Sequence, residues 1–195
     1  MRRTDLIAGL AGAALVGMSP MAVAAAMPRT SRRVLWLRRE GFNEEIMAPF
    51  TTDGVTVYGP GYRQICWLMR DHAVPFAQGY VQFDINEIQA LWEVQQALKL
   101  HGIVSPLVIT SGYRTQATNE AIEGAARNSQ HLYARAVDMY VPSVSTRDLF
   151  GICYAQGTSG GIGYYSDHVH LDCGSRRWWV GELAVPAFAQ GSLAT

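Results

Sequence analysis

The order of apolar and polar residues predicts a chain that alternates short strands with helices. The longest regular stretch, residues 84–102 (DINEIQALWEVQQALKLHG), has apolar side chains at helical spacing, begins at a capping Asp84 or Asn86 and ends at Gly102. We expect this helix to pack on the central sheet. Two shorter helices are predicted, at residues 62–74, ending near His72, and at residues 145–157, capped by Ser145 or Thr146.

Short apolar runs bounded by turn residues predict the strands. These runs lie at residues 32–40, 53–62, 106–115 and 134–142, and a Gly-rich turn with a final pair of strands is predicted within residues 159–174. Residues 119–127 fit either a helix or a loop. The mixed order of elements predicts an α+β fold.

The first residues have the layout of an export signal. MRR precedes a short apolar run, LIAGLAGAALVGM, and small residues follow it, so we expect a signal peptide over residues 1–26 that is cleaved near Ala24 to Ala26. A membrane span needs roughly 20 apolar residues, and the run ends before Pro20. We therefore expect an exported, periplasmic protein without a stable membrane span after cleavage. The paired Arg2 and Arg3 leave both the Sec and the twin-arginine route open.

The composition fits one ordinary globular domain with a real core. Of 195 residues 49% are hydrophobic, and 16 basic residues balance 16 acidic ones. No basic stripe is present, so we expect no nucleic-acid partner. Cys66, Cys153 and Cys173 allow one disulfide and one free thiol in an oxidising compartment, but the spacing does not choose the pair.

The segment SDHVHLDCG is the main chemical signal. On a regular strand His168, His170 and Asp172 would share one face, which is unusually polar for a core. His131 and Asp138 lie seven residues apart, with Asp138 on a predicted strand next to the strand of His170. Two histidines and one carboxylate form a three-ligand zinc site that leaves a fourth position for water. The sequence therefore predicts zinc-dependent hydrolysis of an amide bond.

Three motifs together resemble a known family: SGYRT, SQHLYARAVD and GGIGYYSDHVHLDCGSRRWW. The chain is similar to the zinc D-Ala-D-Ala peptidases of the hedgehog/DD-peptidase fold, and in particular to the YcbK-like branch of exported murein endopeptidases, over residues 34–179. The resemblance implies a central, mainly antiparallel sheet flanked by helices, with the zinc ion (Zn²⁺) on the sheet. It implies that His131, Asp138 and His170 hold the zinc and that Arg114 contacts the substrate as a clamp for a carboxylate or an oxyanion. The alternative for Arg114 is a structural salt bridge.

The resemblance favours Asp167, three residues before the last histidine, as the general base. Strand parity places Asp167 on the opposite face from His170 unless the strand begins after it. His168 is then the alternative acid or base. We expect Asp172 and Ser129 to support the ligands. The family usually has glycine four residues before the aspartate ligand, where this chain has Ala134.

These observations predict a zinc metallopeptidase domain at residues 34–180, followed by a C-terminal tail at residues 181–195. The expected substrates are peptidoglycan stem peptides or crosslinks. A D-Ala-D-Ala carboxypeptidase or dipeptidase, and a non-hydrolytic, zinc-containing module that binds the cell wall, are the alternatives. The sequence does not identify a regulatory protein partner.

Overall fold

The computed structural model describes residues 32–157 and 159–181. The predicted signal peptide and almost all of the predicted C-terminal tail lie outside these residues. Among the helices in this part of the chain, none combines the length and the apolar character that crossing a membrane requires.

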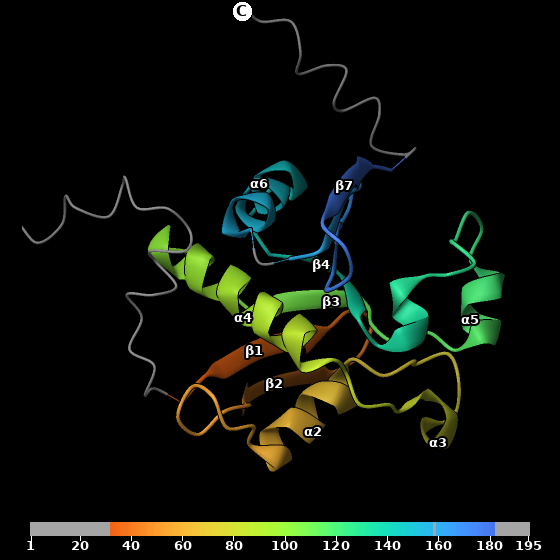
Figure 1. The fold of residues 1–195 in the computed structure, drawn as a ribbon, viewed down its shortest axis with the longest axis horizontal. Helices are drawn as coiled ribbons and strands as arrows, with labels where there is room; N and C mark the ends of the chain where they lie inside the picture. Colours follow the sequence, from red (N-terminus) through yellow and green to blue (C-terminus); the bar gives the residue numbers. More distant parts are fainter. Residues whose placement is uncertain (1–31, 158, 182–195) are drawn as a thin grey trace, which may run out of the picture.

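The centre of the molecule is one seven-stranded sheet with the order β2-β1-β3-β4-β6-β5-β7. The strands are β1 (Val34–Arg39), β2 (Glu44–Pro49), β3 (Leu107–Ser111), β4 (Ala136–Tyr140), β5 (Gly161–Tyr164), β6 (Val169–Asp172) and β7 (Arg177–Val180). Helices accompany the sheet, so the predicted α+β class is correct (Figure 1).

The sheet is mixed, which corrects the expectation of a mainly antiparallel one. β1 pairs with β3, and β5 with β7, in parallel. The first parallel pair arises because β2 runs antiparallel to β1 and returns the chain to the end where β1 begins, and the three helices that follow lead from there to the start of β3. The second arises because the chain leaves β6, passes the start of β5 and adds β7 on the far side of β5.

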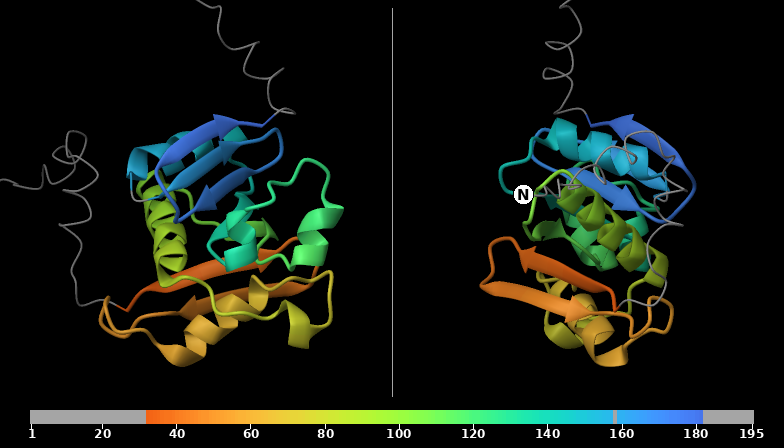
Figure 2. Two further views of the ribbon diagram at one scale, coloured as in Figure 1. Left: turned by 45° about the vertical axis from the view of Figure 1, so that its right-hand side comes forward. Right: turned by 90° about the vertical axis from the view of Figure 1, so that its left-hand side faces the viewer.

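Helices lie on both sides of this sheet. They are α2 (Gly59–Leu68), α3 (Phe76–Gly79), α4 (Ile85–Leu100), α5 (Gln116–Ala121) and α6 (Thr146–Gln156), with the 3₁₀ helix η1 (Gln130–Tyr133). α4 and α6 contact each other, and Figure 2 shows them together on one side, with η1 and α5 on the other. The core joins sheet and helices in a single cluster, whose largest fully buried members include Phe50, Leu35, Leu37, Ile65, Leu68, Ile88, Leu91 and Met139.

The predicted helix at residues 84–102 is confirmed as α4. The Asp84 side chain accepts a hydrogen bond from the backbone N–H of Asn86 and caps the helix. Inside the helix, the buried Gln95 side chain bonds both the N–H (3.0 Å) and the C=O (2.9 Å) of Trp36 in β1. The pairing of β1 with β3 starts only at Leu37, so Gln95 satisfies backbone groups that β3 does not reach.

The second strand is not at residues 53–62, as the sequence predicted. Asp53 accepts backbone hydrogen bonds from Val55 (2.9 Å) and Thr56 (2.6 Å), which closes a local turn. β2 instead occupies Glu44–Pro49, a half-exposed stretch whose polar residues hide its strand character. α2 begins at Gly59, earlier than predicted, with a proline in its first turn.

Candidate active site

The register of the sheet gathers polar residues on one face. Asp138 in β4 lies opposite both Ser111 in β3 and His170 in β6. Two residues further along the same strands, Asp172 lies opposite Ala136. The expectation that Asp138 and His170 occupy neighbouring strands is confirmed.

η1 brings His131 to this face. The Ser129 side chain accepts a hydrogen bond from the backbone N–H of His131 and caps the short helix. Ala134 then adopts a left-handed conformation (φ 51°), which reverses the chain so that it enters β4. The resemblance leads us to expect glycine at this position, and the turn is formed with a Cβ at some conformational cost. The spacing between His131 and Asp138 is therefore set by one helical turn and one left-handed residue.

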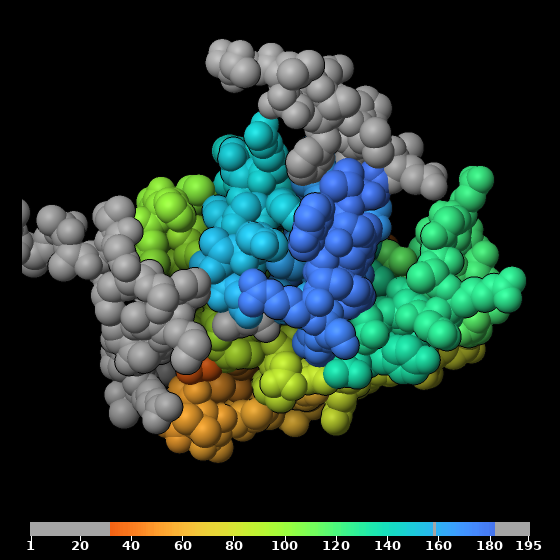
Figure 3. Space-filling view, turned by 45° about the horizontal axis from the view of Figure 1, so that its top comes forward, coloured from red at the N-terminus to blue at the C-terminus, as the bar shows by residue number. Residues whose placement is uncertain are grey.

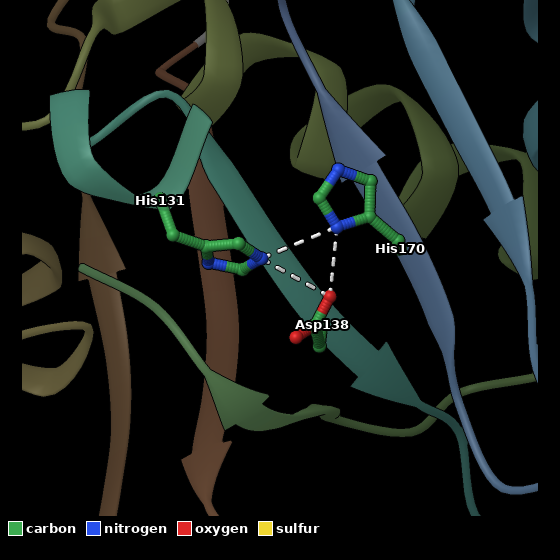
Figure 4. A group of neighbouring side chains, drawn as sticks. All are labelled: His131, Asp138 and His170. Carbon is green, nitrogen blue, oxygen red and sulfur yellow. Dashed lines mark hydrogen bonds and ion pairs between the residues drawn. The ribbon is translucent and has the colours of Figure 1, made fainter. Parts of the chain in front are cut away.

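Three side-chain atoms converge where η1, β4 and β6 meet (Figure 4). His131 Nε2 lies 3.2 Å from Asp138 Oδ1 and 3.2 Å from His170 Nδ1, and the last two atoms are 2.8 Å apart. All three residues are buried. No other group of three such ligand residues close enough to share a metal ion occurs among residues 32–157 and 159–181.

The outer nitrogen of each histidine already has an acceptor. His131 Nδ1 lies 2.6 Å from the Gly112 carbonyl, and His170 Nε2 lies 3.1 Å from Asp172 Oδ2. Because a carbonyl and a carboxylate only accept, these nitrogens carry hydrogens, and the inner nitrogens of the neutral rings present lone pairs. Three acceptors therefore face one another, which requires a positive charge between them.

The pKa values follow from burial and from this geometry. Burial lowers the pKa of His131. Burial also opposes the charged forms of His170 and Asp138, but their mutual contact and the neighbouring groups outweigh it. As a result the pKa of His170 is raised and the pKa of Asp138 is well below its usual range. A proton on His170 can supply the required charge, and a metal ion would replace it.

Arg114 lies beside the outer oxygen of Asp138. Its Nη2 donates to Asp138 Oδ2, its Nε donates to Ser111 Oγ (2.8 Å), and its backbone N–H donates to the His131 carbonyl (3.2 Å). The salt bridge considered for Arg114 is therefore present. The residue also lines the cleft above the site, so it contacts Asp138 and borders the cleft at the same time.

The loop that carries Arg114 is anchored to the end of α2. Tyr113 N–H donates to the Met69 carbonyl (2.8 Å), and Thr115 N–H donates to the buried Asp71 carboxylate (2.8 Å). A Cβ at Gly112 would lie only 2.1 Å from the Met69 carbonyl oxygen, so the close approach requires glycine. The SGYRT motif therefore allows the backbone at Gly112 to pass close to the end of α2, and it also supplies Arg114.

His168 faces the three convergent atoms, whereas Asp167 lies behind it. β6 begins at Val169, after both residues. His168 Nε2 is 4.0 Å from Asp138 Oδ1, and its Nδ1 is 2.7 Å from Asp167 Oδ1. The His168 ring stacks on Tyr165 with centroids 4.4 Å apart. The Asp167 side chain is 82% exposed and is not among the residues lining the cleft.

Two residues of the site were not predicted from the sequence, Arg177 and Trp179 in β7. Arg177 bonds Asp172, and the Trp179 ring lies 5.1 Å from the ring of His170. Both side chains reach across β5, where the sheet pairs them with Gly161 and Gly163. A Cβ at Gly161 would lie 2.6 Å from Arg177 Nη1, and one at Gly163 would lie 2.7 Å from Trp179. The Gly-Ile-Gly run, which lies in the segment predicted as a Gly-rich turn with a final pair of strands, is the signal that could have revealed this crossing.

Above these residues the surface forms a cleft of about 500 Å³. One wall is the segment from Ile122 to Gln130, between α5 and η1, and the other contains Tyr165, Arg177 and Trp179. Figure 3 shows β7, in blue, on one side and the green segment around α5 on the other. His131, Asp138 and His170 lie at the base of an open groove that can admit an extended peptide.

The peptidase M15 family model matches residues 69–172. That range is more than half of the chain and includes Arg114, His131, Asp138, His168 and His170. This chain belongs to the peptidase M15 family. A curated relative, the probable peptidoglycan L,D-endopeptidase MepK of Haemophilus influenzae (strain ATCC 51907 / DSM 11121 / KW20 / Rd), is 27% identical over 180 residues, covering 88% of this chain and 92% of the relative.

In this M15 peptidase the three cysteines are thiols. Cys66 and Cys153 are buried and Cys173 is half-buried. Burial raises the pKa of Cys153 to about 12 and that of Cys173 to about 11. None of them belongs to the convergent group of ligand atoms, so the described site consists of imidazole and carboxylate groups.

Proposed function

We propose that this M15 peptidase is a zinc-dependent peptidoglycan endopeptidase that cuts an amide bond in the crosslinks or stem peptides. The observation that carries the proposal is the convergence of His131 Nε2, Asp138 Oδ1 and His170 Nδ1 within 3.2 Å of one another at the base of a cleft. The family membership and the name of the MepK relative give the reaction class and the polymer.

The three groups fit zinc by their chemistry. Two imidazoles and one carboxylate are ligands that zinc prefers, and three protein ligands leave a position open for catalysis. Tetrahedral zinc with bonds of roughly 2.0–2.1 Å has ligand atoms about 3.3 Å apart, close to the 2.8–3.2 Å found here. When bound, zinc would lower the pKa of a water molecule and polarise the scissile carbonyl.

We assign the general base to His168 and give Asp167 the supporting role, which reverses the preference from the sequence. The Asp167 carboxylate accepts from His168 Nδ1 and leaves the Nε2 lone pair facing the site. His168 can then take a proton at Nε2 from the attacking water and deliver it to the leaving amine. Stacking on Tyr165 fixes the plane of the imidazole. Asp167, mostly exposed, acts by orienting His168.

Arg114 has two roles in the proposed site. Its guanidinium holds Asp138 Oδ2, which directs Oδ1 towards the two histidines. Arg114 also lines the cleft, and we assign to its remaining N–H groups the stabilisation of negative charge that develops on the carbonyl oxygen. The proposed substrate lies outside the cytoplasm, in agreement with the export signal predicted at residues 1–26.

The test is digestion of purified peptidoglycan and of isolated muropeptide dimers, with products identified by mass spectrometry. The wild type should convert dimers to monomers with zinc and lose this activity on chelation. His170→Ala should abolish cleavage and zinc binding together. His101→Ala, at an exposed position on the C-terminal side of α4, is the matched control and should retain both. Release of a terminal D-Ala alone would replace the endopeptidase by a carboxypeptidase.

A second pair of variants tests the base. His168→Ala should reduce kcat by about 10²-fold to 10⁴-fold, the usual contribution of a general base. Asp167→Asn should reduce it less, because the imidazole remains and only its orientation suffers. A larger loss in Asp167→Asn than in His168→Ala would return the base to Asp167.

A further inference from the structure

The guanidinium of Arg177 is held in the wall of the cleft by fixed partners. Nη1 donates to Asp172 Oδ1 (3.2 Å) and to the Ser175 carbonyl (3.0 Å), and Nη2 donates to Asp172 Oδ2 (2.6 Å). Its Cζ also lies 5.1 Å from the centre of the Trp179 ring. Asp172 itself is fully buried and accepts from Gly161 N–H and Gly174 N–H as well. The Arg177 side chain is therefore fixed before any substrate binds.

One face of this guanidinium has no acceptor. A guanidinium has five N–H groups, and the three bonds above use both N–H groups of Nη1 and one of Nη2. The Nε–H and the second N–H of Nη2 remain, and they point to the same side as a parallel pair. In residues 32–157 and 159–181 no group accepts from either. This pair matches the two oxygens of a carboxylate.

The side chain that carries the unused pair of N–H groups is partly exposed and borders the cleft. The Arg177 side chain is 44% exposed and lines the cleft with His168, His170 and Trp179. Arg114 lines the same cleft but lies beside Asp138, whereas Arg177 lies beside Asp172. An extended peptide in the cleft therefore passes a second cation, next to the place proposed for the reaction.

We propose that Arg177 binds a free carboxylate of the peptide substrate through Nε–H and Nη2–H and so determines which stem peptides are cut. This inference rests on the proposed function. The substrate class it names is peptides with an unmodified carboxylate near the scissile amide. The same peptide with that carboxylate converted to an amide would offer only one acceptor oxygen and no charge.

The experiment compares synthetic crosslinked peptides that differ only in whether one carboxylate is free or amidated, with each carboxylate amidated in turn. For the wild-type holoenzyme, amidation of one position should raise KM by about tenfold or more, the effect of losing a charge-assisted bidentate pair. Arg177→Gln should show the raised KM on the free peptide and no further effect of amidation. Arg177→Lys, which keeps the charge without the paired N–H groups, should recover part of the difference.

Arg176→Gln is the matched control, because Arg176 is the exposed neighbour whose guanidinium approaches Gly157 instead of the cleft. It should keep the wild-type preference. If Arg177 only positions Asp172, Arg177→Gln will lower kcat equally on free and amidated peptides and preserve their KM ratio, which overturns the proposal. Equal KM values for all peptides in the wild type overturn it as well.

Direct binding separates this inference from the proposed function. Titration calorimetry of the free and amidated peptides into wild type and Arg177→Gln measures the carboxylate contact whether or not a bond is cut. The wild type could bind the free peptide more tightly than the amidated one without cutting either, and Arg177→Gln could abolish that binding preference. This result would overturn the endopeptidase function and support the carboxylate site. Absence of any preference in binding overturns the carboxylate site.

Discussion

Glu87 in α4 provides a sharp test of the electrostatics behind the site. The residue is fully buried, and neither of its carboxylate oxygens has a hydrogen-bond partner among the described residues. Burial raises its pKa well above the usual 4.5, and the negative charges of Asp172, Asp84 and Asp138 raise it further. The folded protein therefore keeps Glu87 protonated where the unfolded chain releases the proton.

This difference makes stability depend on pH with a definite sign. Above pH 4.5 the folded state binds more protons at Glu87 than the unfolded state, so the free energy of unfolding decreases as pH rises. The slope is about 1.4 kcal/mol per pH unit and continues up to the pKa of the folded state. Glu87→Gln keeps the size of the side chain and removes the titration. Its stability relative to the wild type should therefore increase by about 1.4 kcal/mol for each pH unit in this window.

The assay is urea unfolding followed by tryptophan fluorescence at several pH values from about 5 to about 8, at constant metal content. Other titrating groups cancel in the difference between variant and wild type. Glu120→Gln makes the same chemical change at an exposed position and is the matched control for the substitution itself. A difference for Glu87→Gln that stays constant with pH would refute the reasoning, because it would mean that Glu87 titrates alike in both states.

Three further predictions concern the backbone and the support of the site. Gly163→Ala should lower the free energy of unfolding by about 1–3 kcal/mol because its Cβ would overlap the Trp179 ring. Gly151→Ala, with open space around it in α6, should raise the free energy of unfolding by about 0.5–1 kcal/mol, and thermal unfolding compares the two variants. Ala134→Gly should raise the melting temperature and increase the free energy of unfolding by about 1 kcal/mol or less, because Ala134 has a φ of 51° that favours glycine. A lower melting temperature would contradict the proposed backbone strain. Asp172→Asn should weaken metal binding by about 10-fold to 100-fold in chelator competition, and unchanged affinity would show that the carboxylate does not tune the site.

The strands that carry the proposed ligands could be predicted from the sequence because their local signals agree. The apolar run at residues 134–142 ends at a proline, and α4 has both a capping Asp84 and helical periodicity. Once β4 and β6 are neighbours, the alternation of side chains puts Asp138 and His170 on one face. The predicted neighbourhood of these two strands, which are distant in sequence, is present in the structure.

The contribution of β7 to the site could not be predicted from local sequence signals, because it depends on which residues lie opposite in the neighbouring strand β5. Glycine is depleted in strands, so Gly161 and Gly163 indicate a turn when read alone. Next to β7 they are the absent side chains across which Arg177 and Trp179 reach β6. The burial of Glu87 could not be predicted for a similar reason. Its position in the helix is compatible with an exposed polar residue, and only the packing of α4 shows that the carboxyl is enclosed.

Charge balance connects the proposed metal with the proposed substrate. Arg114, Asp138, His170, Asp172 and Arg177 form an unbroken chain of contacts across the site, in which a guanidinium at each end meets one carboxylate. The two pairs cancel formally, so a divalent cation held by His170 and Asp138 would leave the base of the cleft positive. Coulomb attraction then favours an anionic peptide, most strongly at low salt. Because Arg177 adds a directional pair of N–H groups to that field, it can select one carboxylate, whereas the field alone attracts any anion.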